Sequence, residues 1–262
     1  MSGYYENDAV SASLLKTVAM QSAAHADYRR KNPVKPTKAM RLGTAAHAAI
    51  LDDFDSLIAV EPGFDKRSKK GKEEYERWAV GLNGKTIITP EQAELVAGMQ
   101  AATEAHPIAN DLLNQCYATE VEVFFDIDGL ACKSKFDAMN GEDGLIVDLK
   151  TTQDASPKAF ARQSANLLYH MQMAFYEQAS QIDDLDMIVI AVENKPPHGV
   201  AVYRYGPEVL MQGAVMFSEA IDQWKEYQAE DASSVVQHYG VDIHDMKLPA
   251  WAIIQDMKET TI

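Results

Sequence analysis

TEVEVFFDIDGLACKSKFDAMNGEDGLIVDLKTT, residues 119–152, is the stretch that decides the fold. Residues 119–126 alternate between apolar and polar side chains, as a strand with one buried face does, and 130–138 and 145–151 also favour strands. Asp128-Gly129, between the first two runs, is a strong hairpin signal, and residues 141–144 predict a second turn. We therefore predict a three-stranded meander.

Patterns on both sides of the meander predict a mixed α/β (α+β) fold, with a central mixed sheet flanked by helices. Upstream, helices are expected after a cap at Ser11 or Ser13, over about 37–52, from the Thr89-Pro90 start to Ala105, and over 108–113, with an exposed loop at 63–72. Downstream, we expect a helix over about 157–181, strands at 187–193 and 200–205, and a helix over 207–230. No long linker divides the chain, which predicts one domain over 1–262, with a helical part to about residue 115 and the central sheet with its helices from about 116 onwards.

The composition is that of an ordinary globular protein, with 47% hydrophobic and 24% charged residues in a chain of 262. No apolar run approaches the roughly 20 residues of a membrane span, and the N-terminus does not resemble a signal peptide. Two cysteines cannot form a four-cysteine zinc or iron–sulfur site. The expectation is a cytoplasmic protein that is not bound to a membrane.

The formal net charge of −15 is unevenly distributed. Residues 28–41 carry six Lys and Arg residues and no acid, and a second basic cluster falls at 66–72. A local basic track can bind phosphates on an acidic protein, although both runs could equally be solvated loops.

Asp148 and Lys150 end the third predicted strand, two residues apart, so their side chains project to the same face while Leu149 points into the core. Asp137 ends the preceding strand and lies near Asp148 only if the turn is wide or the strands are offset. Two converging carboxylates repel each other unless a hard cation such as magnesium binds between them. The alternative is a surface Asp–Lys pair worth about 0 to 1 kcal/mol.

Four motifs in order make the chain resemble the PD-(D/E)XK nuclease superfamily, in its RecB-like and especially RecE-like exonuclease branch. They are Gly43-Thr44-Ala45-Ala46-His47, Lys135-Phe136-Asp137, Val147-Asp148-Leu149-Lys150-Thr151-Thr152, and Gln172-Met173-Ala174-Phe175-Tyr176. The resemblance runs over nearly the whole chain. It departs from many relatives at Asp148, where they have Glu and RecE-like members share Asp.

The resemblance implies a role for each residue that matches a motif. The implied metal ligands are His47, Asp137, Asp148 and the carbonyl of Leu149, and Lys150 is implied to be catalytic. Gln172 and Tyr176, four apart on a predicted helix, would face the active site, and this interpretation is favoured over ordinary amphipathic patterning. Without the resemblance, His47 would be interpreted as an ordinary helix histidine, because magnesium prefers oxygen ligands.

Contacts to DNA are expected from the basic run and from the end of the third strand. Arg29, Arg30 or Arg41 could bind a 5′-phosphate, and Thr151 and Thr152 could contact other phosphates. Glu120 and Glu122 lie on the first strand of the meander. One of them could reach the metal, but a solvated strand edge is the favoured interpretation.

The resemblance implies a magnesium-dependent exonuclease (with manganese as a substitute) that degrades one strand of linear double-stranded DNA, 5′→3′. A ring-shaped homo-oligomer (a tetramer is the expectation) that acts on double-stranded DNA ends with a single-strand annealing recombinase would fit such an enzyme. Alternatives are a site- or structure-specific endonuclease of the same superfamily and a non-catalytic DNA-binding protein on this fold. A small-molecule-binding domain lacks support, because no Gly-rich phosphate loop is present.

Overall fold

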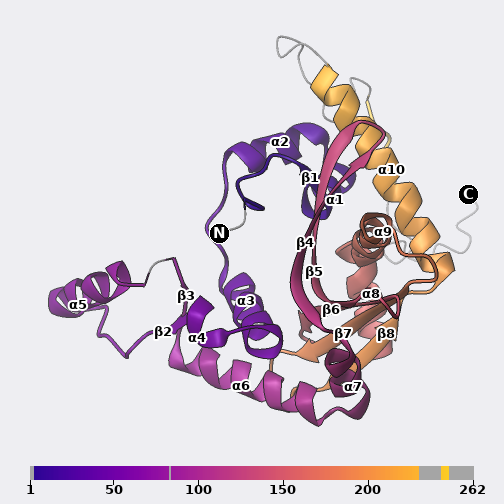
Figure 1. Cartoon of the computed structure of the whole chain (residues 1–262). Helices are drawn as coiled ribbons and strands as arrows, with labels where there is room; N and C mark the ends of the chain where they lie inside the picture. The colour runs from indigo at the N-terminus through magenta and orange to yellow at the C-terminus, as the bar shows by residue number, and fades with distance from the viewer. Residues whose placement is uncertain (1–2, 83, 230–242, 248–262) are drawn as a thin grey trace, which may run out of the picture.

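A computed structural model describes residues 3–82, 84–229 and 243–247. Its centre is a six-stranded mixed sheet in the order β1-β5-β6-β7-β8, with β4 paired to β5 (Figure 1). The strands are β1 (Val10–Ser11), β4 (Ala118–Ile127), β5 (Leu130–Asn140), β6 (Leu145–Thr152), β7 (Asp186–Glu193) and β8 (Val200–Arg204). The expected α/β class, the meander β4-β5-β6 and both later strands are confirmed. The structure adds β1, which the sequence did not indicate.

Strand β5 has neighbours on both edges. β4 pairs antiparallel with it over nearly its whole length. The opposite edge is shared: β6 pairs with residues 138–140, and β1 pairs in parallel with Cys132 and Lys133. Residues 134–137 lie between these two partners, so the sheet opens beside Asp137. Polar side chains from several elements can therefore approach the sheet at this position.

Helices cover both faces of the sheet (Figure 1). One core joins the sheet to α1, α2, α8, α9 and α10, and the other joins it to α3, α6 and α7. The bounds are α1 (Ala12–Met20), α2 (Ala23–Lys31), α3 (Lys38–Leu51), α6 (Pro90–Ala105), α7 (Pro107–Gln115), α8 (Pro157–Asn166), α9 (Tyr169–Ser180) and α10 (Pro207–Ala229). The apolar side chains of β6 alternate between the two cores because successive side chains point to opposite faces.

Side-chain caps begin the helices where the sequence indicated. Ser11 and Thr37 cap α1 and α3, and Thr89 forms a reciprocal capping box with Gln92 at the start of α6. The expected single helix over 157–181 was wrong. Leu168 adopts a left-handed conformation (φ 52°) that ends α8 and starts α9 in a new direction.

Residues 58–88 form a projection from the body of the protein (Figure 1). Short parallel strands β2 (Ile58–Val60) and β3 (Thr86–Ile88) form its base, beside the one-turn helix α4 (Phe54–Leu57). Helix α5 (Lys69–Val80) lies at its far end. The expected loop at 63–72 is therefore correct only up to Ser68, which caps α5. None of the helices in the described ranges combines the length and apolarity that a membrane crossing requires.

Candidate metal centre and active site

Three acidic residues occupy one row across strands β4, β5 and β6. The β4–β5 register pairs Thr119 with Ala138, and the β5–β6 register pairs Ala138 with Val147. Continuing both registers by one residue places Asp137 opposite Glu120 on one side and opposite Asp148 on the other. The turns therefore need be neither wide nor offset to bring Asp137 and Asp148 together, contrary to the condition that the sequence suggested.

His47, Glu120 and Asp137 form a cluster whose ligand atoms all lie within 4.8 Å of one another. His47 comes from the middle of α3, and its Nδ1 lies 3.5 Å from Asp137 Oδ2. Asp137 Oδ2 also accepts a hydrogen bond of 2.8 Å from the backbone N–H of Leu149. The cluster opens into a cavity of about 530 Å³ that is also lined by Gly43 and Thr86.

Glu120 has a left-handed backbone conformation, with φ of 54°. Such a conformation costs a non-glycine residue about 1 to 2 kcal/mol, so surrounding structure must hold it. Its carboxylate forms an ion pair with Lys135 and lies within the cluster. The expectation that Glu120 sits on a solvated edge was therefore wrong.

Asp148 is fully buried and is not among the residues that line this cavity. Its Oδ2 lies 2.6 Å from Lys150 Nζ, and its Oδ1 accepts a hydrogen bond of 3.3 Å from Gln172 Nε2. The predicted common face of Asp148 and Lys150 is confirmed by this ion pair. Leu149, between them, is fully buried in the opposite core, as alternation predicts.

Helix α9 contributes Gln172 and Tyr176, which lie on one face as their spacing predicted. Gln172 Nε2 lies 2.8 Å from Tyr176 Oη as well as 3.3 Å from Asp148. Lys16, on α1, donates a hydrogen bond of 2.9 Å to Gln172 Oε1. Because a lysine can only donate, it fixes the amide with Oε1 toward α1 and Nε2 toward Asp148. Lys16 thus sets the orientation of a side chain that contacts the buried acid.

Burial and neighbouring charges shift the pKa values of several groups in and around the cluster. Burial raises the pKa of Asp137 from 3.8 to about 6; His47 opposes that rise, and Asp148 adds to it. Burial alone would lower the pKa of Lys150, but the Asp148 and Asp137 carboxylates outweigh it and the pKa is raised. Burial and the nearby Lys150 lower the pKa of Lys16 from 10.5 to about 8. The metal-free site therefore disfavours the ionised form of Asp137.

The donor set fits a divalent cation. Two carboxylates and one imidazole converge in the cluster, and the raised pKa of Asp137 reflects a burial penalty that a bound cation would remove. His47, Glu120 and Asp137 could hold the ion, with Asp148 on the strand next to Asp137. Sequence reasoning missed Lys16, and it considered Glu120 but favoured a solvated edge. Counting back from the Asp128-Gly129 turn would have paired Glu120 with Asp137; no sequence signal marks Lys16.

The predicted DNA-contacting residues are scattered. Thr151 lies near Gly43 of α3, at the edge of the cavity, whereas Thr152 is buried and its hydroxyl donates to Gln163 Oε1 at 2.8 Å. Arg30 pairs with Asp27 at 3.0 Å and stacks over Trp224. The structure does not bring Thr152 or Arg30 to the cluster.

Two other arginines line separate hollows. Arg29 lines a cavity of about 400 Å³ beside β1, on the side of α2. Arg41 lines a hollow of about 480 Å³ at the base of the projection. That second hollow shares Thr86 with the metal-cluster cavity, so Arg41 is the predicted arginine that lies next to the candidate site.

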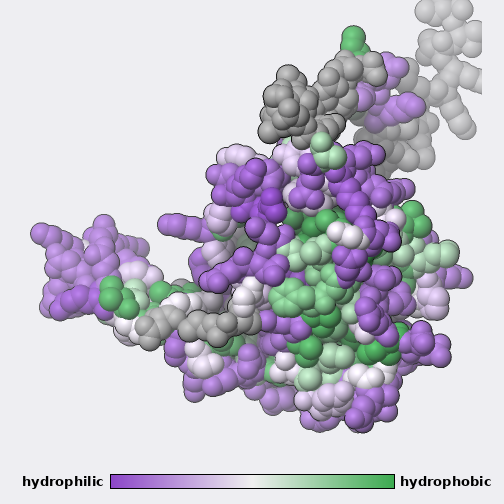
Figure 2. All heavy atoms as spheres, turned by 45° about the horizontal axis from the view of Figure 1, so that its top comes forward, coloured by the Kyte–Doolittle hydropathy of each residue, from purple (hydrophilic) through white to green (hydrophobic). Residues whose placement is uncertain are grey.

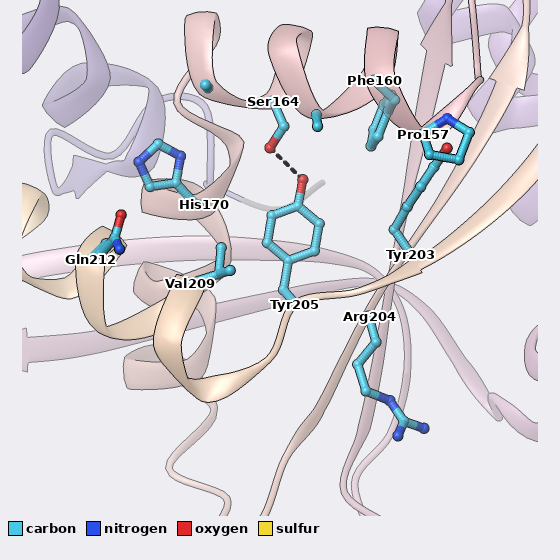
Figure 3. Close-up of a pocket in the computed structure, with 11 residues that line it drawn as sticks. Pro157, Phe160, Ser164, His170, Tyr203, Arg204, Tyr205, Val209 and Gln212 are labelled. Atoms are coloured by element: carbon cyan, nitrogen blue, oxygen red, sulfur yellow. Dashed lines mark hydrogen bonds between the residues drawn. The ribbon is translucent and has the colours of Figure 1, made fainter.

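A second large cavity, of about 500 Å³, lies between α8, β8 and the start of α10 (Figure 3). Apolar and aromatic side chains dominate it, and Ser164 and Tyr205 point toward each other with their hydroxyl oxygens 2.6 Å apart. None of the residues that line it is a carboxylate, so it offers no metal site comparable to the cluster around Asp137.

Comparison with known proteins identifies a matching family for this chain and a solved structure with a similar fold. A family model described as a PDDEXK-like domain of unknown function (DUF3799) matches residues 11–236. A crystal structure of a candidate exonuclease from Eubacterium rectale is similar over 92% of this chain and 91% of that one, with a TM-score of 0.58 and 13% identity. A phage-related exonuclease from Haemophilus somnus aligns over 84% and 95% with 12% identity, but its TM-score of 0.36 supports no argument. A search of curated proteins found no match.

Proposed function

Because the chain belongs to the family of PDDEXK-like domains (DUF3799), we propose that it is a magnesium-dependent exonuclease that degrades one strand of linear double-stranded DNA. One observation carries the proposal: Asp137 brings His47 and Glu120 into one cluster, while Asp148 and Lys150 form an ion pair one strand away. Carboxylates that converge beside a buried lysine suit phosphodiester hydrolysis, and a folding role alone would not require them.

The residues divide into three groups by role. His47, Glu120, Asp137 and Asp148, with the carbonyl of Leu149, would hold magnesium, with manganese as a substitute. The metal would activate a water molecule and stabilise the charge that develops on the scissile phosphate. Lys150, which pairs with Asp148, would orient the attacking water and neutralise phosphate charge. Gln172, fixed by Lys16, holds Asp148 in place, and Tyr176 holds Gln172.

The finer features of the proposal come from the RecE-like motifs. We propose 5′→3′ polarity, a product with 3′ single-stranded tails, and action in the cytoplasm with a single-strand annealing recombinase. A single domain over 1–262 would assemble into a closed ring, such as a tetramer, around double-stranded DNA. Such a ring could orient its basic residues inward and its acidic residues outward, which suits a chain with a net charge of −15.

End-labelled linear double-stranded DNA, digested with and without magnesium, tests the activity, its metal requirement and its polarity together. We expect loss of nucleotides from 5′ ends in magnesium and no loss in EDTA. Asp148→Ala should abolish cleavage. Asp148→Asn is the matched variant because it keeps the shape of a fully buried side chain. Full activity of both variants would refute the proposed site.

Two rival functions are distinguished by a circular substrate and by a binding assay. A site- or structure-specific endonuclease of this superfamily would cut covalently closed circular DNA, which an end-dependent exonuclease leaves intact. A non-catalytic DNA-binding protein would retain linear DNA in a binding assay but release no nucleotides. The ion pair of Asp148 with Lys150 favours an active enzyme over the non-catalytic protein.

A further inference from the structure

The first turn of α5 and the residues just before it carry a dense run of positive charge. Residues 66–72 contain Lys66, Arg67, Lys69, Lys70 and Lys72 with no acid among them, in a chain whose net charge is −15. Figure 2 shows hydrophilic side chains gathered on this projecting end of the molecule. The side chains of Lys69 and Lys70 are 93% and 85% exposed.

Helix stability does not account for these cations. Lysines in the first turn of a helix interact unfavourably with the helix dipole, and α5 has no acid in that turn. Lys69 and Lys70 lie 3.9 Å from Glu73 and Glu74, a distance at which exposed pairs contribute little. Their positive charge therefore remains available to a partner.

The projection keeps a defined shape without the main core. The rings of Phe64, Tyr75 and Trp78 pack against one another with centroids 5.7 to 6.0 Å apart. Lys66 Nζ lies 4.1 Å from the centroid of the Tyr75 ring. Residues 61–82, which we call the arm, thus present their lysines on an ordered support.

Two neighbouring cavities lie between the arm and the metal cluster and share one lining residue. Thr86, at the base of the arm, lines both the cavity that holds Asp137 and the hollow that holds Arg41. Lys66 and Tyr75 of the arm line the hollow that holds Arg41. Glu61 is the one acidic residue among the described residues that line it, and it forms an ion pair with Lys66. Cationic groups therefore continue from the edge of the candidate active site to the arm.

We propose that the arm binds the phosphate backbone of double-stranded DNA whose end lies in the metal cavity. The choice of DNA as the ligand rests on the proposed nuclease function. The arm would bind DNA as a polyanion, through its phosphates and without contacts to the bases. Double-stranded DNA is the ligand that the charge run and the shared cavities favour. A second copy of the chain is the rival occupant, and a measurement of oligomeric state detects it.

The test replaces Lys69, Lys70 and Lys72 together with alanine, a residue that strengthens the helix rather than unfolding it. A matched control replaces three exposed cations elsewhere: Lys158, Arg162 and Lys195. Binding of a fluorescent DNA duplex is measured in EDTA against KCl concentration, so the result does not depend on cleavage. The arm variant should lower the salt slope by up to about 2.7, or about 0.9 for each phosphate that the arm no longer neutralises, and the control should not.

Equal slopes and affinities for the arm variant and the control would overturn the arm proposal while leaving the nuclease proposal intact. A change in oligomeric state by light scattering, with unaltered DNA binding, would assign the arm to a subunit contact and also overturn it. Wild-type protein that binds no DNA in EDTA would overturn the arm proposal, and only a lack of cleavage in magnesium as well would overturn both proposals. Cleavage at saturating DNA should retain its wild-type rate in the arm variant, because the metal cluster is untouched.

Discussion

Replacing Asp137 with asparagine should stabilise the metal-free protein at neutral pH, although it removes a metal ligand. The pKa of the Asp137 carboxyl rises from 3.8 to about 6 on folding, chiefly through burial. Between pH 4 and 6 the folded chain therefore binds more protons than the unfolded chain. Stability contributed by this group falls as the pH rises through that window and stays lower above pH 6.

The size of the effect follows from the two pKa values. Their difference corresponds to about 3 kcal/mol of stability lost above pH 6. The asparagine side chain carries no charge to bury, and its amide oxygen can still accept the hydrogen bond from the Leu149 N–H. For a chain of this size, 1 kcal/mol shifts the melting temperature by roughly 2 to 4 °C, so D137N should melt several degrees higher at pH 7. At pH 4 the two proteins should differ little.

Thermal and urea unfolding in EDTA, from pH 4 to 8, measures the difference, with the exposed Asp183→Asn as control. Manganese should remove most of this difference. Metal at about 100 times its dissociation constant stabilises wild-type protein by about 2.7 kcal/mol, and D137N should lose much of that gain. Equal or lower stability of D137N in EDTA at pH 7 would show that burial of the ionised Asp137 carboxylate does not destabilise the metal-free protein, which would refute this prediction.

Three further predictions concern neighbouring groups. Glu120→Gln should weaken manganese binding at least about ten-fold by titration calorimetry, whereas Glu122→Gln should not; equal affinities would remove Glu120 from the cluster. Glu120→Gly should also raise the metal-free melting temperature, since φ of 54° costs a non-glycine residue about 1 to 2 kcal/mol; a lower value would contradict the strain. Lys16→Met should slow single-turnover cleavage about 10- to 100-fold with DNA affinity nearly unchanged, because the Gln172 amide is then free to turn away from Asp148. Lys16→Arg should restore part of that rate, and loss of affinity instead would make Lys16 a DNA contact.

Local patterns predicted those features of the fold that depend on near neighbours in the chain. The alternation in 145–151 placed Asp148 and Lys150 on one face, and Thr89-Pro90 marked the start of α6. The break at Leu168 was missed because a left-handed leucine leaves no signal in composition or periodicity. Helix α5 was missed, and its first residues were assigned to a loop, because this charged helix lacks the buried apolar stripe that marks amphipathic helices.

At the site, too, local sequence patterns were informative, whereas contacts between distant parts of the chain could not be predicted. The motifs identified His47, Asp137 and Asp148 as candidate metal ligands, but this role came from the resemblance and not from geometry. Lys16 is 156 residues from Gln172, and nothing in its own helix distinguishes it from a surface lysine. Contacts of that separation are set by how α1 packs on α9, which single-sequence patterns do not contain.

The β5–β6 hairpin also affects how sequences that carry this site should be recognised. Asp137 lies three residues before Asn140, and Asp148 lies three residues after Leu145, the pair that closes the ladder. Residues 141–144 lie beyond that pair, so insertions there would lengthen the loop and leave the two acids facing each other. Deletion of one residue within either strand would turn one acid to the opposite face. A search pattern should therefore let the loop length vary and hold constant the distance from each acid to the closing pair.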